Sequence, residues 1–262
     1  MLASKTAYGD TLVRLRRVGP IGLAAETQYS LLPPLSFASR EVTVAAALEP
    51  CYNVAGDTID YSVDAGRTSV GVFDGMGHGL HSAQCAALTV AAYRNARRGD
   101  QALAQIFQTI DETLQESLGG EAFTTAVIAE LDTVSGLLSW VNAGHPEPLL
   151  LRGGKHVKSL YVEPRPPLGL GDLNADGLTV GTEQLEPGDL ILIFTDGVVE
   201  ARSPDGDFFG VERLADLVLR HLAGGLPAAE TMRRVVRELL DHQGGQLSDD
   251  ATLLLLEWPT PA

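Results

Sequence analysis

L-I-L-I-F-T-D-G, residues 190–197, places the carboxylate of Asp196 directly after an apolar, strand-like run. The same pattern recurs in A-G-D-T-I-D with Asp57 and Asp60, in V-G-V-F-D-G-M-G-H-G with Asp74, and in S-D-D-A-T-L-L-L-L with Asp249 and Asp250. A carboxylate at the end of a buried strand is costly unless its charge is compensated, and a divalent cation is a common compensation. Mg2+ and Mn2+ take oxygen ligands and are held by few carboxylates together with waters. We therefore expect a fold that brings these four strand ends together around hard metal ions.

The composition narrows the class of protein. The chain has 262 residues, 45% of them hydrophobic, and a formal net charge of -15. This acidity argues against a nucleic-acid binder and against attraction to an anionic membrane surface. No apolar run approaches the length of a membrane span, and the N-terminus lacks the apolar core of a signal peptide. Cys51 and Cys85 lack metal-binding spacing and are interpreted as two reduced thiols, so we expect a cytoplasmic protein.

The order of apolar patterns indicates the architecture. Strands are predicted over residues 42–48, 59–63, 69–73, 122–131, 137–142, 148–151, 179–185, 190–194 and 251–258. Helices are predicted over residues 21–32, 80–98, 101–118, 211–222 and 227–242. Because strands are bunched between pairs of helices, antiparallel sheets are favoured over a doubly wound parallel sheet. The predicted fold is α+β: a central antiparallel β-sandwich flanked by helix pairs, in four layers α-β-β-α.

The prediction divides the chain at two prolines. Residues 1–34 form an N-terminal segment whose helix ends at Pro33-Pro34, because proline cannot continue a helix and restricts the residue before it. Residues 35–262 are predicted to form one domain. The N-terminal helix is interpreted either as a switch that alters the position of Asp57 or as an ordinary capping helix.

Each acidic motif also has a structural interpretation. Asp74-Gly75 and Asp196-Gly197 can each be simple turns, since Asp-Gly is a common turn dipeptide. Their recurrence together with Asp57 and Asp249 favours metal ligands. A glycine after the ligand lets the main chain approach an ion and offer the Gly75 carbonyl.

Two histidines keep alternative interpretations. His78, four residues after Asp74, is either a proton donor facing phosphate or a solvated loop residue. His145 in N-A-G-H-P is a turn or orienting residue, or a catalytic one. The chain contains no G-x-S-x-G elbow, Walker loop or dinucleotide fingerprint after a strand.

These motifs, in this order, resemble the metal-dependent phosphatase 2C-type serine/threonine phosphatases, and within them the SpoIIE/RsbU-like branch. The resemblance runs over about residues 26–258 and includes Q-Y-S-L-L-P-P, N-A-G-H-P-E-P-L, P-L-G-L and the acidic motifs. It implies a β-sandwich flanked by helix pairs, which agrees with the element order above.

The resemblance implies a catalytic site with two or more Mn2+ or Mg2+ ions. The residues that match the family's ligands are Asp57, Asp74, the Gly75 carbonyl, Asp196 and Asp249. Asp250 is the less favoured member of its pair.

Three positions depart from the family pattern. Ala55 stands where a glycine is usual and narrows the space at that turn, and Met76 replaces a histidine of eukaryotic relatives. The basic phosphate-binding residue has only Arg40 as a candidate.

The implied function is hydrolysis of a phosphoserine or phosphothreonine ester by a metal-activated water. The implied substrate is a regulatory protein such as an anti-anti-sigma factor of the STAS type, with a homodimer through the N-terminal helix as a further expectation. The alternatives are a catalytically weak binding module of the same fold and a hydrolase for small phosphorylated molecules.

Overall fold

The computed structural model describes residues 29–51, 55–77, 79–99, 101–171 and 177–260. Its helices and strands, in chain order, are β1 (Ser36–Ala38), β2 (Thr43–Glu49), β3 (Asp57–Asp64), β4 (Arg67–Gly75), α3 (Leu80–Arg98), α4 (Leu103–Leu118), β5 (Thr124–Asp132), β6 (Leu137–Ala143), β7 (Leu149–Arg152), β8 (Lys155–Ser159), β9 (Gly181–Gln184), β10 (Leu190–Phe194), α5 (Asp196–Val199), α6 (Val211–Ala223), α7 (Ala228–His242) and β11 (Ala251–Glu257).

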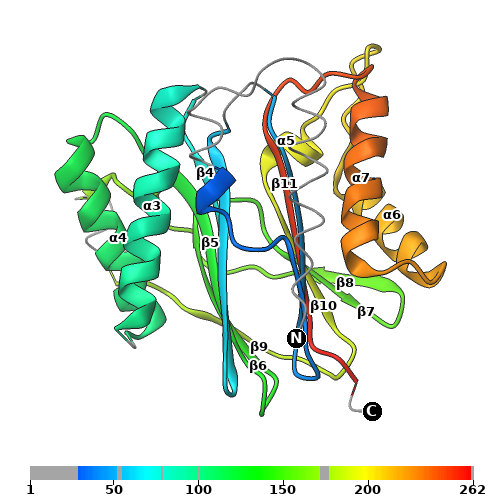
Figure 1. The fold of residues 1–262 in the computed structure, drawn as a ribbon, viewed down its shortest axis with the longest axis horizontal. Coiled ribbons are helices and arrows are strands. Elements are labelled where there is room, and N and C mark those ends of the chain that lie inside the picture. The colour runs from blue at the N-terminus through cyan, green and yellow to red at the C-terminus, as the bar shows by residue number, and fades with distance from the viewer. Residues whose placement is uncertain (1–28, 52–54, 78, 100, 172–176, 261–262) are drawn as a thin grey trace.

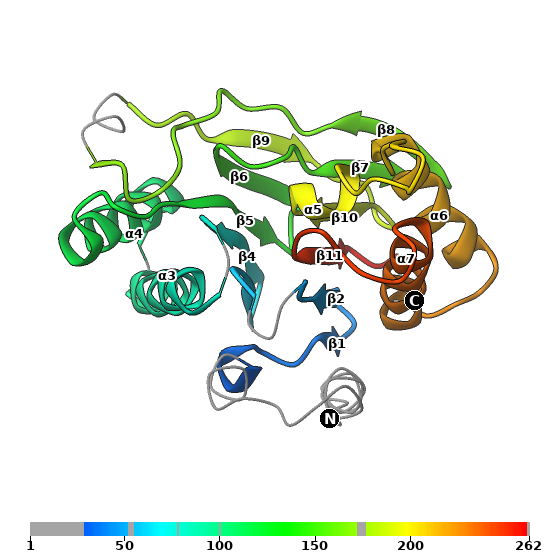
Figure 2. The ribbon, with the colours of Figure 1, turned by 90° about the horizontal axis from the view of Figure 1, so that it is seen from above.

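Two antiparallel sheets form the centre of the molecule. The six-stranded sheet has the order β1-β2-β11-β10-β7-β8, and the five-stranded sheet has the order β3-β4-β5-β6-β9. The α3/α4 pair covers the outer face of the five-stranded sheet, and the α6/α7 pair covers the outer face of the six-stranded sheet (Figures 1 and 2). The predicted four-layer α-β-β-α sandwich is confirmed.

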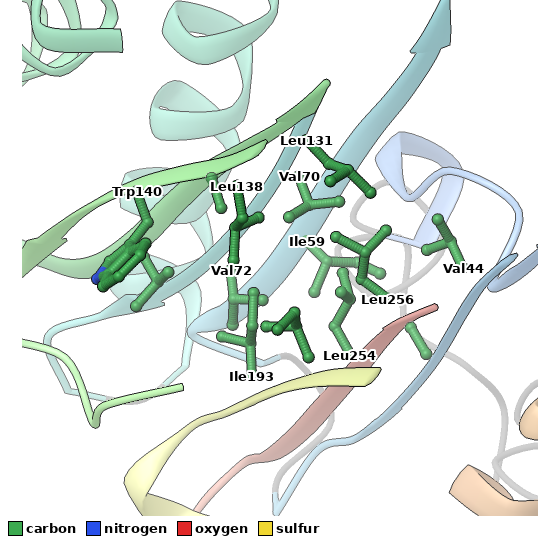
Figure 3. Packing of buried hydrophobic residues seen from close by; sticks show 14 of the residues in the cluster. Val44, Ile59, Val70, Val72, Leu131, Leu138, Trp140, Ile193, Leu254 and Leu256 are labelled. Carbon is green, nitrogen blue, oxygen red and sulfur yellow. The ribbon is translucent and has the colours of Figure 1, made fainter. Parts of the chain in front are cut away.

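Three apolar layers explain why the strands read as nearly continuous hydrophobic runs. In β11, Leu254 and Leu256 pack between the two sheets, while Leu253 and Leu255 face α6 and α7. Successive side chains of a strand point to opposite faces, so a strand covered on both sides is apolar at every position. Figure 3 shows the layer between the sheets, where Ile193 and Leu254 lie opposite Val72 and Ile59.

The helix predictions hold closely where the structure describes them. α3 has the predicted bounds, and α4 starts two residues later than predicted, at Leu103. Of the predicted helix over residues 21–32, residues 29–32 lie within the described part, and residues 29–31 are helical. Three short elements were not predicted: β1, β8 and the one-turn helix α5.

Candidate metal centre

Asp57 and Asp74 lie opposite each other on neighbouring strands. They are direct partners in the antiparallel register of β3 and β4, at the end where β3 begins and β4 ends. Asp57 is 1% exposed and Asp74 is half-buried. The charge of Asp74 is one of the causes that raise the pKa of Asp57, so the two carboxyl groups lie near each other.

The six-stranded sheet brings further carboxylates to the same end of the sandwich. Asp196 follows β10 and opens α5, and Asp249 and Asp250 precede β11. The Thr195 backbone N–H donates to the Thr252 carbonyl at 3.1 Å, so the end of β10 lies beside the start of β11. Figure 1 shows α5, the start of β11 and the end of β4 at one end of the molecule.

The pKa values report this convergence. Burial raises the pKa of Asp74 to about 7, with further contributions from the charges of Asp196, Asp249 and Asp250. The pKa of Asp57 lies well above its usual range because of burial and then the nearby Asp74 and Asp250. Burial, followed by the charges of Asp249 and Glu200, also raises the pKa of Asp196. Carboxylates that raise one another's pKa are stabilised in the ionised form by a cation.

The donor chemistry fits a hydrated hard cation rather than a closed protein cage. Within the described residues, no three His, Cys, Asp or Glu side chains are gathered closely enough to enclose an ion by themselves. Mg2+ in particular keeps several waters and uses one or two carboxylates, so neighbouring carboxylates from two sheets suit such an ion. The assignment of Asp57, Asp74, Gly75, Asp196 and Asp249 as ligands stays a prediction.

Asp249 and Asp250 have different surroundings. The Asp250 carboxylate accepts hydrogen bonds from the backbone N–H groups of Cys51 at 2.8 Å and Gly56 at 2.6 Å, which ties β11 to the segment before β3. Asp249 is exposed, and its carboxylate accepts from the Asp250 N–H at 2.8 Å. The oxygens of Asp250 are thus engaged with the backbone, which favours Asp249 as the ligand.

Glycines allow close backbone contact at this end. The Gly75 N–H donates to the Gly56 carbonyl at 3.1 Å, and a Cβ on Gly56 would lie 2.7 Å from the Gly75 carbonyl oxygen. This close approach occurs at Gly56, whereas the Ala55 methyl packs in the core between the sheets. The expected narrowing at Ala55 is therefore not what shapes the turn.

Asp60, the second acidic residue of A-G-D-T-I-D, has partners other than a metal ion. Asp60 is buried but is compensated by arginines, with the Arg94 Nη2 and the Arg97 Nη2 each 2.7 Å from its carboxylate. The i, i+3 spacing of these arginines on α3 was the available signal, since it places both on one face of the helix.

The interpretation of Arg40 as a phosphate-binding candidate is wrong. Arg40 precedes β2 at its Thr43 end, which pairs with Glu257, whereas Asp249 and Asp250 precede the opposite end of β11. Arg40 is thus at the far end of the sheet from the carboxylates.

His145 occupies an orienting position. Its side chain is 6% exposed, and its Nδ1 lies 2.8 Å from the hydroxyl of Thr125, the register partner of Asp74. The His145 N–H donates to the Asn142 side-chain oxygen, whose amide donates back to the His145 carbonyl. Burial lowers the pKa of His145 to about 3. The Phe194 carbonyl raises this pKa, but its effect is smaller than that of burial, so the ring is neutral at physiological pH. His78 lies outside the described residues.

A fold of two antiparallel sheets between helix pairs, with carboxylates at one end, is that of the phosphatase 2C-type protein phosphatases. The SiaA-PP2C domain of Pseudomonas aeruginosa has this fold, with a TM-score of 0.75 at 23% identity, over 97% of this chain and 99% of that chain. The catalytic domain of the serine threonine protein phosphatase PstP, in complex with two manganese ions, matches with a TM-score of 0.59 at 16% identity, over 84% of this chain and 99% of that chain.

The Stage II sporulation protein E (SpoIIE) family profile matches residues 64–259, so the chain belongs to this family. The matched region contains Asp74, Asp196 and Asp249 and begins after Asp57. The phosphoserine phosphatase RsbU of Bacillus subtilis is 26% identical over 246 residues, covering 90% of this chain and 69% of RsbU. In the described residues, no helix has the length and apolar character needed to cross a bilayer.

Proposed function

We propose that this chain is a metal-dependent protein serine/threonine phosphatase that hydrolyses phosphoserine or phosphothreonine with a water molecule as the nucleophile. The observation that carries this proposal is the group of carboxylates from both sheets around Asp74, whose pKa they raise together with burial. Family membership and the similarity to a phosphoserine phosphatase support it.

The proposed division of labour follows from the geometry. Asp57, Asp74, Asp196, Asp249 and the Gly75 carbonyl hold two or more Mn2+ or Mg2+ ions at the end of the sandwich. When bound, such ions lower the pKa of water and neutralise charge on a phosphoryl group. The protein's own carboxylates position the ions and, when ionised, supply the negative charge that retains them.

The thiol environments are consistent with a reaction that forms no covalent phosphoenzyme. Burial, followed by the charge of Asp250, raises the pKa of Cys51 to about 12. Burial also raises the pKa of Cys85. Since the thiolate is the nucleophilic form, neither cysteine is activated at neutral pH.

The test is hydrolysis of an aryl phosphate by metal-free protein, before and after addition of Mn2+. We expect turnover that requires the metal and is abolished by EDTA. Binding of phosphoproteins without metal-dependent turnover would instead support a binding module.

The substrate is proposed to be a phosphorylated anti-anti-sigma protein of the STAS type in a partner-switching system, on the basis of the similarity to RsbU. Comparing kcat/KM on a phosphorylated STAS-domain protein with that on small phosphate esters tests this proposal. A preference for the small esters would favour the alternative function, a hydrolase for small phosphorylated molecules. We also propose a cytoplasmic location for the protein and a homodimer that forms through the N-terminal helix.

Residues 1–34 are proposed to form a switch segment preceding the catalytic domain. Contacts between its described end and β3 support this proposal. The Arg94 guanidinium donates to the Leu31 carbonyl at 2.5 Å as well as to Asp60, and the Tyr61 hydroxyl donates to the Pro34 carbonyl at 2.7 Å. Asp60 and Tyr61 lie on the strand that begins with Asp57, so movement of the segment can be transmitted to that residue.

A further inference from the structure

We infer that Thr195 is a positioning residue that orients the carboxylate of Asp57 for metal binding. The inference rests on the proposed function, because it gives Asp57 the role of a ligand. Thr195 was not among the predicted site residues, although it directly precedes Asp196.

The Thr195 hydroxyl joins the two sheets. Thr195 follows β10 of the six-stranded sheet and is fully buried. Its Oγ1 lies 2.8 Å from the Oδ2 of Asp57, which begins β3 of the five-stranded sheet and is 138 residues away in sequence. A direct side-chain hydrogen bond thus links the sheets at their acidic end.

The direction of this hydrogen bond is determined by a second one. The backbone N–H of Thr252 donates to the Thr195 Oγ1 at 3.0 Å, which occupies an acceptor site of the hydroxyl. An ionised carboxylate can only accept hydrogen bonds. The Thr195 hydroxyl proton therefore points to Asp57 Oδ2 whenever Asp57 is ionised.

This arrangement gives the two carboxylate oxygens of Asp57 different roles. The hydrogen bond engages Oδ2 and limits rotation of the carboxylate, which leaves Oδ1 for a cation. Thr195 is itself held in place, because its backbone N–H donates to the Thr252 carbonyl at 3.1 Å while the Thr252 N–H donates to its side chain. Hydrogen bonds that orient metal ligands typically contribute about 10–100-fold to metal affinity.

The test measures Mn2+ binding directly, by electron paramagnetic resonance of free Mn2+ in titrations of the metal-free protein. Thr195→Val keeps the shape but removes the hydroxyl, and we expect it to weaken Mn2+ binding about tenfold or more. Thr195→Ser retains the hydroxyl and is expected to bind Mn2+ as the wild type does. Thr68→Val is the matched control, because Thr68 is equally buried but lies toward the start of β4, away from Asp74.

Aryl phosphate kinetics give a second readout. We expect Thr195→Val to raise the Mn2+ concentration for half-maximal activity, with KM for the ester changing less. If this variant does not fold, Thr195→Ala, which removes the hydroxyl without adding bulk, is titrated in its place. Wild-type Mn2+ affinity in a folded variant that lacks the hydroxyl would overturn the inference.

Asp57→Asn separates this inference from the proposed function. If the wild type neither binds Mn2+ nor hydrolyses the ester with metal present, the proposed function is wrong, and the inference is overturned with it. A different set of results would overturn only the role of Thr195. In that case the wild type binds Mn2+ and hydrolyses the ester, Asp57→Asn loses metal binding, and Thr195→Val retains it.

Discussion

Asp57 and Asp74 are direct cross-strand partners in β3 and β4, at the end of the sandwich where the other sheet contributes Asp196. Two neighbouring carboxylates with raised pKa values destabilise the metal-free native state when both are ionised. The same repulsion makes the pair a favourable environment for a cation, so stability and metal binding should be coupled.

Asp74→Asn and Asp196→Asn should each lower kcat on an aryl phosphate by at least about a hundredfold, because each removes a carboxylate proposed to hold the metal ions. Both variants should remain folded, and their metal-free melting temperatures should equal or exceed that of the wild type, since a like charge has been removed. Circular dichroism and steady-state kinetics at saturating Mn2+ measure the two effects. Near-normal turnover in either variant would remove that residue from the site.

Mn2+ should raise the thermal stability of the wild type, because an ion that binds only the native state stabilises it by mass action. At a hundred times its dissociation constant, the stabilisation is about 2.7 kcal/mol. Scanning calorimetry in EDTA and in millimolar Mn2+ measures the difference. Identical melting temperatures would contradict a carboxylate site formed in the native state.

The metal-free protein should lose stability as the pH rises toward neutrality. The pKa of Asp74 is raised from 3.8 to about 7, so the native state holds this proton more tightly than the unfolded state does. The stabilisation of the native state by this proton is complete below pH 3.8 and is lost as the pH rises through about 7. Melting curves in EDTA between pH 4 and 8 measure this trend.

Two comparisons identify the source of this pH dependence. The trend should be weaker in Asp74→Asn and should be opposed by Mn2+, which binds the ionised form. A wild-type trend that persists unchanged in Asp74→Asn would assign the effect to other groups.

Deleting residues 1–32 should change kcat or the metal requirement by more than it changes melting behaviour, if the N-terminal segment is a switch. The deletion also removes Tyr29 and Leu32, which are buried in the core between the sheets, and therefore lowers stability to some extent. A sharper change is Arg94→Gln, which weakens the link between the Leu31 carbonyl and Asp60 while leaving that core intact.

Arg98→Gln is the matched control for Arg94→Gln, because Arg98 is exposed at the end of the same helix. We expect Arg94→Gln to raise the Mn2+ concentration for half-maximal activity, and Arg98→Gln to leave it unchanged. If Arg94→Gln and the deletion lower only the melting temperature, with activity per folded molecule and metal dependence as in the wild type, the segment is a capping element.

The sequence by itself determined the types of the long elements and the layered architecture. The apolar runs of β10 and β11 and the three- and four-residue spacing in α4 are local patterns that survive in the structure. The elements missed were too short for such a pattern: β1 has three residues, α5 has four, and the five residues of β8 are largely exposed and polar.

Only the tertiary structure decided which acidic residues remain available for a cation. Asp57 and Asp60 lie three residues apart on one strand, yet Asp60 is paired with Arg94 and Arg97, whereas Asp57 faces Asp74. The compensating groups come from segments distant in sequence, and Thr195 reaches Asp57 from the opposite sheet. A local pattern can show that a buried carboxylate needs a partner. The partner's identity depends on the packing of helix against sheet and of sheet against sheet, because charge compensation acts through space rather than along the chain.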